Sequence, residues 1–74
     1  MKVKVIAPFH LPGQDAEGCL ELPGGTRVQN LLRLGRAPLY ARLLPVSVNG
    51  EQAPKSRELK DGDVVIFIAP ISGG

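Results

Sequence analysis

The sequence predicts a small α+β domain in which one helix lies across one face of a mixed sheet. Apolar and polar residues alternate with a period of two near the N-terminus, follow helical spacing in the middle, and give way to a continuous β-branched run near the C-terminus. The chain has 74 residues, of which 43% are hydrophobic and 22% charged, as in a single globular domain. The predicted element order is strand, strand, helix, strand, short strand and strand.

The first two strands are predicted to form a hairpin. Residues 2–9 alternate lysines with valines, which is the pattern of a half-buried strand, and Phe9 closes its inward row. Residues 10–18 are rich in turn-forming Pro and Gly. Residues 19–23 alternate again, with two leucines inward and Cys19 outward, so they can pair with the first strand.

The helix is predicted to start within residues 24–37. Thr26 is a favourable N-cap residue, and the apolar side chains within residues 28–32 share one face at helical spacing. Gly35 and Pro38 indicate that the helix is short and ends in that region.

The remaining chain contains two turn signals and one inner strand. Residues 38–44 fit either a short helical turn or an irregular crossing, whereas Asn49-Gly50 between two extended runs predicts a hairpin. Asp61-Gly62-Asp63 predicts a tight turn. Residues 64–69 are β-branched or aromatic at almost every position, as in an inner strand that is apolar on both faces. Pro70 cannot donate to a ladder, so the sheet is predicted to end there.

The last strand has two apolar rows, but a single helix covers only one face of the sheet. Val65 and Phe67 are predicted to lie under the helix, and the other row is left for a partner protein to cover. The predicted partner-binding residues are this second row and the start of the tail, namely Val64, Ile66, Ile68, Pro70, Ile71 and Ser72.

Four arginines fall between residues 22 and 50, where the chain has no acidic residue. Without an aromatic platform for bases, this pattern favours a solvated helix face over nucleic-acid binding, and docking to an acidic partner stays open. The longest apolar run, residues 64–69, is too short to span a membrane, and the N-terminus lacks the apolar segment of a signal peptide. We therefore expect a cytoplasmic protein with no nucleic-acid or membrane partner.

Residue types for independent catalysis are scarce. One histidine and one cysteine provide no metal-ligand cluster, and His10 beside Cys19 is more simply a coincidence than a catalytic pair. Cys19 has no electropositive neighbour in sequence, so no catalytic role is expected for it. Asp61 and Asp63 flank a glycine as turn formers do, and residues 22–26 lack the lysine and spacing of a phosphate-binding loop. We expect no bound metal or cofactor and no enzyme activity of the chain alone.

The C-terminal Gly73-Gly74 is the chemically distinctive feature. Two residues without side chains can thread a narrow channel and present a carboxylate to another protein's active site. Coupled to AMP, that carboxylate becomes an activated acyl group open to attack by an amine or a sulfur nucleophile. The predicted organisation is a folded domain over residues 1–70 and a flexible tail over residues 71–74.

Three segments together resemble the sulfur-carrier proteins of the MoaD/ThiS family, which are β-grasp domains of the ubiquitin superfamily. KDGDVVIFIAPISGG (60–74) resembles the closing segment of that family, VSVNGE (46–51) its preceding hairpin, and GTRVQNLL (25–32) the start of its helix. The likeness covers essentially the whole chain.

The resemblance implies a mechanism centred on Gly74. A ubiquitin-activating-type enzyme would use ATP to convert the Gly74 carboxylate to an acyl-adenylate, and a persulfide sulfur donor would then leave a thiocarboxylate on it. Gly73 would give access to the terminus. The sulfur would finally pass to an acceptor enzyme such as the molybdopterin-synthase large subunit or a thiazole synthase.

The resemblance leaves open which biosynthetic pathway receives the sulfur. PISGG (70–74) resembles the molybdopterin-synthase small subunit, which we favour, whereas the short chain and helix resemble the thiamine carriers. A carrier for tRNA thiolation or a ubiquitin-like modifier could have the same tail. A ubiquitin-like interaction module with inert glycines is the alternative from another functional class.

Overall fold

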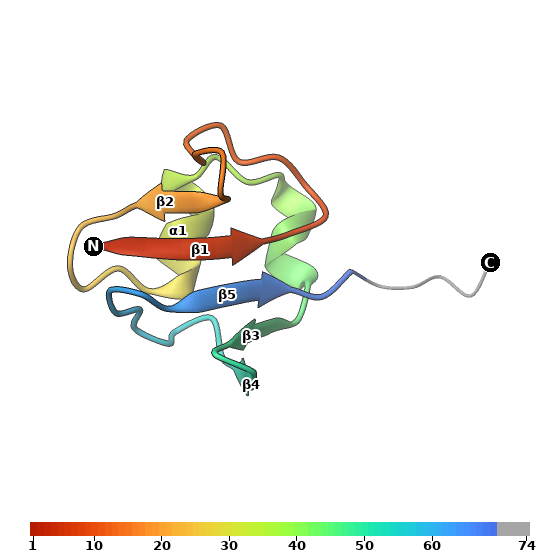
Figure 1. Ribbon diagram of the computed structural model, residues 1–74. Helices are drawn as coiled ribbons and strands as arrows, with labels where there is room; N and C mark the ends of the chain where they lie inside the picture. Colours follow the sequence, from red (N-terminus) through yellow and green to blue (C-terminus); the bar gives the residue numbers. More distant parts are fainter. Residues whose placement is uncertain (70–74) are drawn as a thin grey trace.

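A computed structural model describes residues 1–69 of the chain, which form one five-stranded sheet with a helical layer on one side (Figure 1). The strand order is β2-β1-β5-β3-β4. The strands are β1 (Lys2–Ile6), β2 (Cys19–Glu21), β3 (Val46–Val48), β4 (Glu51–Ala53) and β5 (Val64–Phe67), and the helical elements are α1 (Val28–Leu34) and the 3₁₀ helix η1 (Leu39–Leu43). The predicted order of elements is confirmed.

The centre of the sheet is the parallel pair β1 and β5, with Val5 beside Val65. All other pairs are antiparallel, including the predicted hairpins β1–β2 and β3–β4. Because β5 lies between β1 and β3, it is the inner strand that its continuous apolar sequence predicts. The sheet is therefore mixed, as expected.

The first strand is shorter than the sequence predicts. It ends at Ile6 rather than at Phe9, and Pro8, which has no N–H to donate, lies just beyond its end. The Phe9 ring still packs against the core, with its centroid 5.3 Å from that of Phe67 and 6.1 Å from that of Tyr40. The alternating pattern thus continues beyond the strand because the aromatic ring fills space at the end of the sheet.

Thr26 is not the N-cap of α1, contrary to the sequence prediction. The N-cap is Arg27, whose N–H donates to the Asn30 side chain (3.2 Å), while the Thr26 hydroxyl donates to the carbonyl of Pro23 (2.7 Å). Backbone carbonyls of the segment before β5 accept from the first helical N–H groups, those of Val28 (3.0 Å) and Gln29 (2.8 Å). Arg27 forms an isolated antiparallel β-bridge with Glu58 of the same segment, which keeps Arg27 extended. The helix therefore starts one residue later than predicted.

The helix ends where the sequence predicts, but the left-handed residue is an arginine. Gly35 is the C-cap with φ −84°, and Arg36 follows with φ +56°. Gly35 is needed for space, because a Cβ there would lie 3.1 Å from the Leu31 carbonyl and 3.3 Å from the Leu11 side chain. The ambiguous stretch 38–44 proves to be a short helical turn, η1.

One hydrophobic core lies between the sheet and the helical layer. Val65 and Phe67 of β5 are buried in it, as predicted, together with the apolar face of α1. Leu11 and Leu59 complete the core from loops, and both are almost fully buried. Within residues 1–69, no helix combines the length and apolar character needed to cross a bilayer.

The two predicted turns are confirmed and are joined to each other. Asn49 (φ +54°) and Gly50 (φ +87°) have the paired positive φ angles of a type I′ hairpin turn. The Asn49 side chain donates to Asp63 (2.9 Å) and accepts from the N–H of Val64 (3.0 Å). Asp63 also accepts from the N–H of Lys60 (2.8 Å), which closes the second turn. This network fixes the start of β5 beside β3.

Asp63 is buried, and its two oxygens accept from different donors. Burial raises the pKa of this carboxyl, but the hydrogen bonds from Asn49 and Lys60 and the nearby cationic groups outweigh it, so the pKa lies below its ordinary value. A depressed pKa stabilises the fold fully above the unfolded-state value of about 3.9, and this contribution is lost as the pH falls through the folded-state value.

We expect Asp63→Asn to cost about 1–3 kcal/mol of unfolding free energy at neutral pH. The amide NH₂ of the asparagine would replace a carboxylate oxygen that accepts a hydrogen bond, so two donors would face each other. The difference from wild type should shrink as the pH falls below the unfolded-state value of about 3.9 and through the lower folded-state value, because the wild-type carboxyl is then protonated. Urea unfolding at several pH values measures it. Asp61→Asn is the control, since Asp61 is exposed and, among residues 1–69, its side chain accepts only from the N–H of Lys2 (2.7 Å). Equal pH profiles for Asp63→Asn and wild type would contradict the assignment.

Candidate functional site

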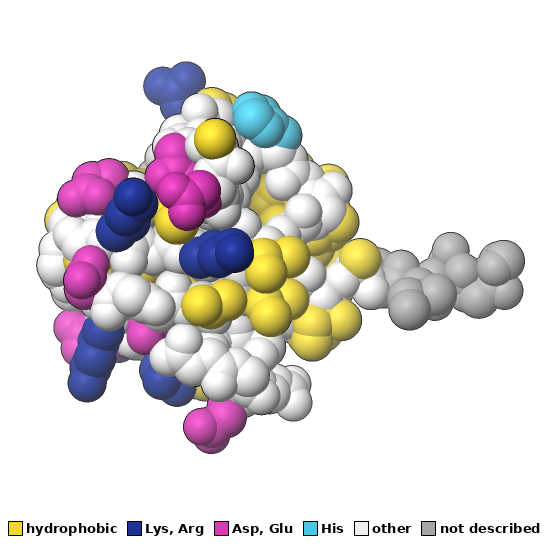
Figure 2. All heavy atoms as spheres, viewed as in Figure 1, with side chains coloured by type: hydrophobic (Ala, Val, Ile, Leu, Met, Phe, Trp, Pro, Cys, Tyr) yellow, Lys and Arg dark blue, Asp and Glu magenta, His cyan; other side chains and the backbone are white. Residues whose placement is uncertain are grey.

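An apolar patch occupies the sheet face that α1 leaves uncovered. We call it the sheet-face patch, and it consists of Ile6, Val64, Ile66 and Ile68. Val64 and Ile66 are half-buried by their neighbours, whereas Ile6 and Ile68 are each 48% exposed. Figure 2 shows hydrophobic side chains gathered over the carboxyl ends of β1 and β5, with a cationic side chain beside them. A contiguous patch of exposed aliphatic side chains is typical of a surface that binds another protein.

The strand register brings these side chains together. Ile66 lies between Ile6 on β1 and Ser47 on β3, and Val64 lies beside Lys4. Lysines occupy the other outward positions of β1, so one edge of the patch is cationic while its centre is aliphatic. An apolar centre with a polar rim is the usual composition of a protein–protein interface.

The structure places Val64, Ile66 and Ile68 on the outer face, opposite Val65 and Phe67, as the strand pattern predicts. Their role in partner binding stays a prediction. Ile6 was missed, although its even position in the alternating strand β1 marks it as the one apolar residue of the outward row. Pro70, Ile71, Ser72, Gly73 and Gly74 lie outside the described residues.

The last described part of the chain is firmly anchored. The N–H of Ile68 donates to the carbonyl of Pro45 (2.9 Å), so pairing with the neighbouring chain extends one residue beyond β5. The ring of Phe67 packs beneath this point against Phe9, which in turn contacts Tyr40 edge to face. The chain is therefore held as far as Ile68, beside the sheet-face patch.

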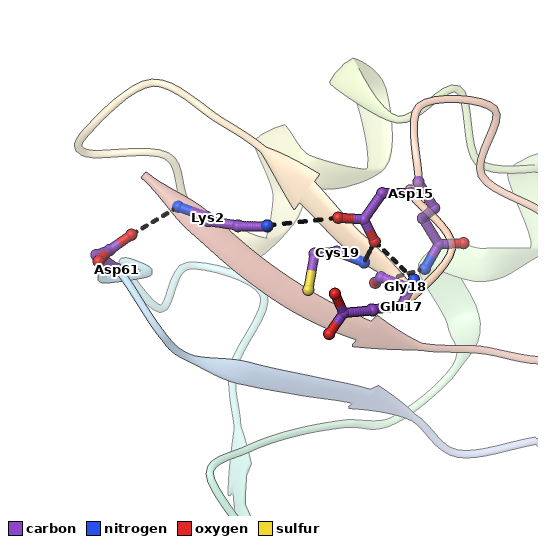
Figure 3. Close-up of polar contacts among 7 residues, drawn as sticks. Lys2, Asp15, Glu17, Gly18, Cys19 and Asp61 are labelled. Carbon is purple, nitrogen blue, oxygen red and sulfur yellow. Dashed lines mark hydrogen bonds and ion pairs between the residues drawn. The ribbon is translucent and has the colours of Figure 1, made fainter.

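The edge formed by β1 and β2 holds the single cysteine and an ion pair (Figure 3). The Lys2 ammonium lies 3.5 Å from a carboxylate oxygen of Asp15, and the other oxygen accepts from the N–H groups of Glu17 and Cys19 (2.9 Å each). These backbone hydrogen bonds, led by that of Cys19, lower the pKa of Asp15, and the negative charge of Asp15 raises the pKa of Lys2. The two backbone hydrogen bonds to Asp15 hold the loop before β2.

Cys19 is half-buried and has a cationic neighbour that the sequence did not reveal, because Lys4 is its cross-strand partner. His10 is exposed in the loop after β1, and within residues 1–69 no hydrogen bond joins its side chain to Cys19. In the same part of the chain, no three His, Cys, Asp or Glu side chains are arranged to hold a metal ion. Asp61 and Asp63 act as turn formers.

The fold and these features define a class. A mixed five-stranded sheet with one principal helix across one face is the ubiquitin-like β-grasp fold. The model of the ThiS family matches residues 9–74. The chain therefore belongs to the ThiS family.

Among solved structures, the crystal structure of SAMP1 from Haloferax volcanii is similar over 100% of both chains, with a TM-score of 0.69 and 19% sequence identity. This likeness supports the fold alone. No curated protein matches the sequence significantly.

Proposed function

We propose that the protein is a sulfur carrier whose Gly74 carboxylate is converted to a thiocarboxylate that donates sulfur in cofactor biosynthesis. The observation that carries this proposal is the match to the ThiS family up to residue 74, where the sequence ends in Gly73-Gly74. The sheet-face patch supports it, because a carrier must be recognised by each enzyme that acts on its terminus.

The chemistry proceeds in balanced steps on a partner enzyme. The Gly74 carboxylate attacks the α-phosphate of ATP, and pyrophosphate leaves, which gives an acyl-adenylate. The terminal sulfur of a protein persulfide then attacks the carbonyl carbon and AMP leaves, which gives an acyl disulfide. A second thiol attacks the donor-side sulfur, so the S–S bond breaks and the electron pair stays on the Gly74 thiocarboxylate. ATP is bound by the activating enzyme and not by this chain.

The folded domain contributes recognition rather than reacting groups. The aliphatic centre of the sheet-face patch supplies desolvated contact area, while Lys4 at its edge favours an orientation against an acidic rim. Because Ile68 is anchored just beyond the end of β5, docking of this patch also fixes Ile68 relative to the partner. Gly73 would leave the approach to the terminal carbonyl unobstructed.

We propose the molybdopterin-synthase large subunit as the acceptor, on the basis of the PISGG ending. A thiazole synthase, a tRNA-thiolating enzyme or a protein lysine would be the acceptor under the alternatives stated above. Incubating the thiocarboxylated protein with each sulfur acceptor and its substrate distinguishes the carriers, because only the true acceptor returns Gly74 to a carboxylate. A modifier would instead form an isopeptide bond when a lysine amine attacks the Gly74 acyl-adenylate and AMP leaves.

The direct test incubates the protein with its ubiquitin-activating-type enzyme, ATP and a persulfide donor, followed by intact-mass spectrometry. We expect one oxygen to be replaced by sulfur, and fragmentation to locate the change at Gly74. A cognate enzyme that binds the domain but leaves Gly74 unmodified would support an inert interaction module instead.

We expect Ile66→Asp to leave the fold intact and to weaken binding of the activating enzyme by about tenfold or more, because a carboxylate would be desolvated at the centre of the patch. Titration calorimetry measures the affinity, and circular dichroism the fold. Gln52→Asp is the matched control, since Gln52 is an exposed residue of the edge strand β4. Unfolding of Ile66→Asp, or an unchanged affinity, would show that the docking assignment is wrong.

A further inference from the structure

A second surface lies on the helical side of the molecule. A cleft of about 640 Å³ separates α1 from η1, and its lining includes four cationic side chains and two leucines, namely Arg33, Arg36, Arg42, Lys55, Leu32 and Leu39. None of the described residues that line it is acidic. The cleft is therefore positively charged and partly apolar.

The positive charge of this cleft is not neutralised within the fold. Among residues 1–69, the two ion pairs are at the β1–β2 edge, and neither involves an arginine. Lys55 donates to the carbonyl of Leu44 (2.6 Å), which keeps its ammonium beside η1 without cancelling its charge. Arg33 lies in the last turn of α1 and Arg42 in the last turn of η1, where a cation complements the helix dipole, whereas Arg36 lies beyond the end of α1. Their charge is available to an anionic ligand.

Arg36 occupies a backbone position at which glycine is the preferred residue. It follows the C-cap of α1 with φ +56°, the left-handed conformation that costs a non-glycine residue stability. The backbone there closes the helix end, with the N–H of Arg36 donating to Arg33 (3.2 Å) and that of Ala37 to Leu32 (2.9 Å). A strained arginine whose side chain lines a cleft indicates a function for that side chain.

The apolar side chains around the cleft distinguish a protein ligand from a nucleic acid. Leu39, which lines the cleft from η1, is 79% exposed. Phosphate backbones are bound by cations without exposed leucines, and bases by aromatic platforms. Leucines beside uncompensated arginines instead fit an amphipathic acidic segment.

The cleft and the sheet-face patch lie on different sides of the sheet, since α1, which lines the cleft, lies behind the sheet in the view of Figure 1. One partner can therefore occupy each surface at the same time. We propose that the α1–η1 cleft binds a short amphipathic segment of a partner protein whose acidic side chains contact Arg36 and Arg42 and whose apolar side chains contact Leu39. This inference is independent of the chemistry proposed for Gly74.

The test uses a synthetic helical peptide of about three turns, with glutamates on one face and leucines on the other, titrated into the full ¹⁵N-labelled chain. We expect saturable binding with shifts confined to α1, η1 and Lys55. Arg36→Gly should weaken binding about tenfold while the thermal midpoint stays equal or rises, because glycine relieves the positive φ. Leu39→Ser should also weaken it several-fold. Lys60→Gln, which removes one exposed cation outside the cleft, should leave the affinity within about twofold.

Four results would overturn the proposal. Absence of saturable binding, or shifts centred on Val64 and Ile66, would mean that the cleft is not the site. If Arg36→Gly and Lys60→Gln weaken peptide binding equally, the affinity depends on the net charge of the protein and not on the cleft. Tighter binding of a single-stranded RNA of similar length, unaffected by Leu39→Ser, would make the cleft a nucleic-acid site.

Discussion

Deletion of Gly74 is expected to abolish thiocarboxylate formation completely while leaving the folded domain unchanged. The reacting carbonyl would then belong to Gly73, one residue too short for a catalytic site that positions the terminus to within a fraction of an ångström. The folded part should be indifferent, because the described core runs from Val3 to Phe67. Intact-mass spectrometry after incubation with the activating enzyme, ATP and a persulfide donor measures the modification.

Two further variants distinguish the effect of tail length from the effect of access to the terminal carbonyl. One additional residue after Gly74 should also abolish modification, because it removes the glycine carboxylate from the catalytic position. Gly73→Val should slow modification without abolishing it, since a β-branched side chain narrows the approach to the carbonyl. Each variant should bind the activating enzyme through the sheet-face patch within a few-fold of wild type. A Gly74 deletion that still acquires sulfur, at Cys19 for example, would show that the terminus is not the acceptor.

The fold could be predicted largely because local patterns and tertiary structure agree. The alternation in β1, the β-branched run of β5 and the Asn49-Gly50 turn each specify a conformation that the sheet then uses. Even the face of β5 could be predicted, because an inner strand with one helix on one side must leave one row uncovered.

The features that the sequence did not predict depend on long-range contacts. Leu11 and Leu59 lie in polar, turn-rich segments, and only the assembled fold places them in the core. Thr26 lost the N-cap position because the segment before β5 supplies carbonyls to the helix start. Left-handed backbone at Arg36 could not be read from an arginine that follows a glycine. In each case a tertiary partner outweighed the local preference.

The candidate site was predictable in part for the same reason. Ile66 and Val64 follow from the period of a single strand, whereas the patch becomes continuous only through the parallel register that brings Ile6 beside Ile66. Similarly, the arginine-rich stretch between residues 22 and 50 favoured a solvated helix face and only left an acidic partner open, because the cleft exists through the packing of η1 beside α1. The chemistry of the terminus rests on sequence and family, and the two surfaces rest on topology.

Phe67→Ala is expected to produce the largest loss of stability of any single substitution considered for this protein, about 3–5 kcal/mol. The ring is 3% exposed at the end of the inner strand, where it lies beside Val46 of β3 and packs edge to face on Phe9. Its removal forfeits both the transfer free energy of the ring and the aromatic contact, and leaves a cavity bounded by strands that cannot close it. Because small domains are stable by only about 5–15 kcal/mol, this is a large fraction of the total.

The loss should lower the thermal midpoint by at least about 12 °C, measurable by circular dichroism and urea unfolding. Ile68→Ala is the matched control one position from the end of β5, and it should cost less than about 1 kcal/mol because Ile68 is exposed on the opposite face. Below its midpoint, Phe67→Ala should still bind the activating enzyme, since the sheet-face patch does not include this ring. Substitutions in the two rows of β5 are therefore expected to have opposite effects: those in the inner row lower the stability, and those in the outer row weaken binding of the activating enzyme. A Phe67→Ala variant as stable as Ile68→Ala, or a folded one that no longer binds, would show that this division is wrong.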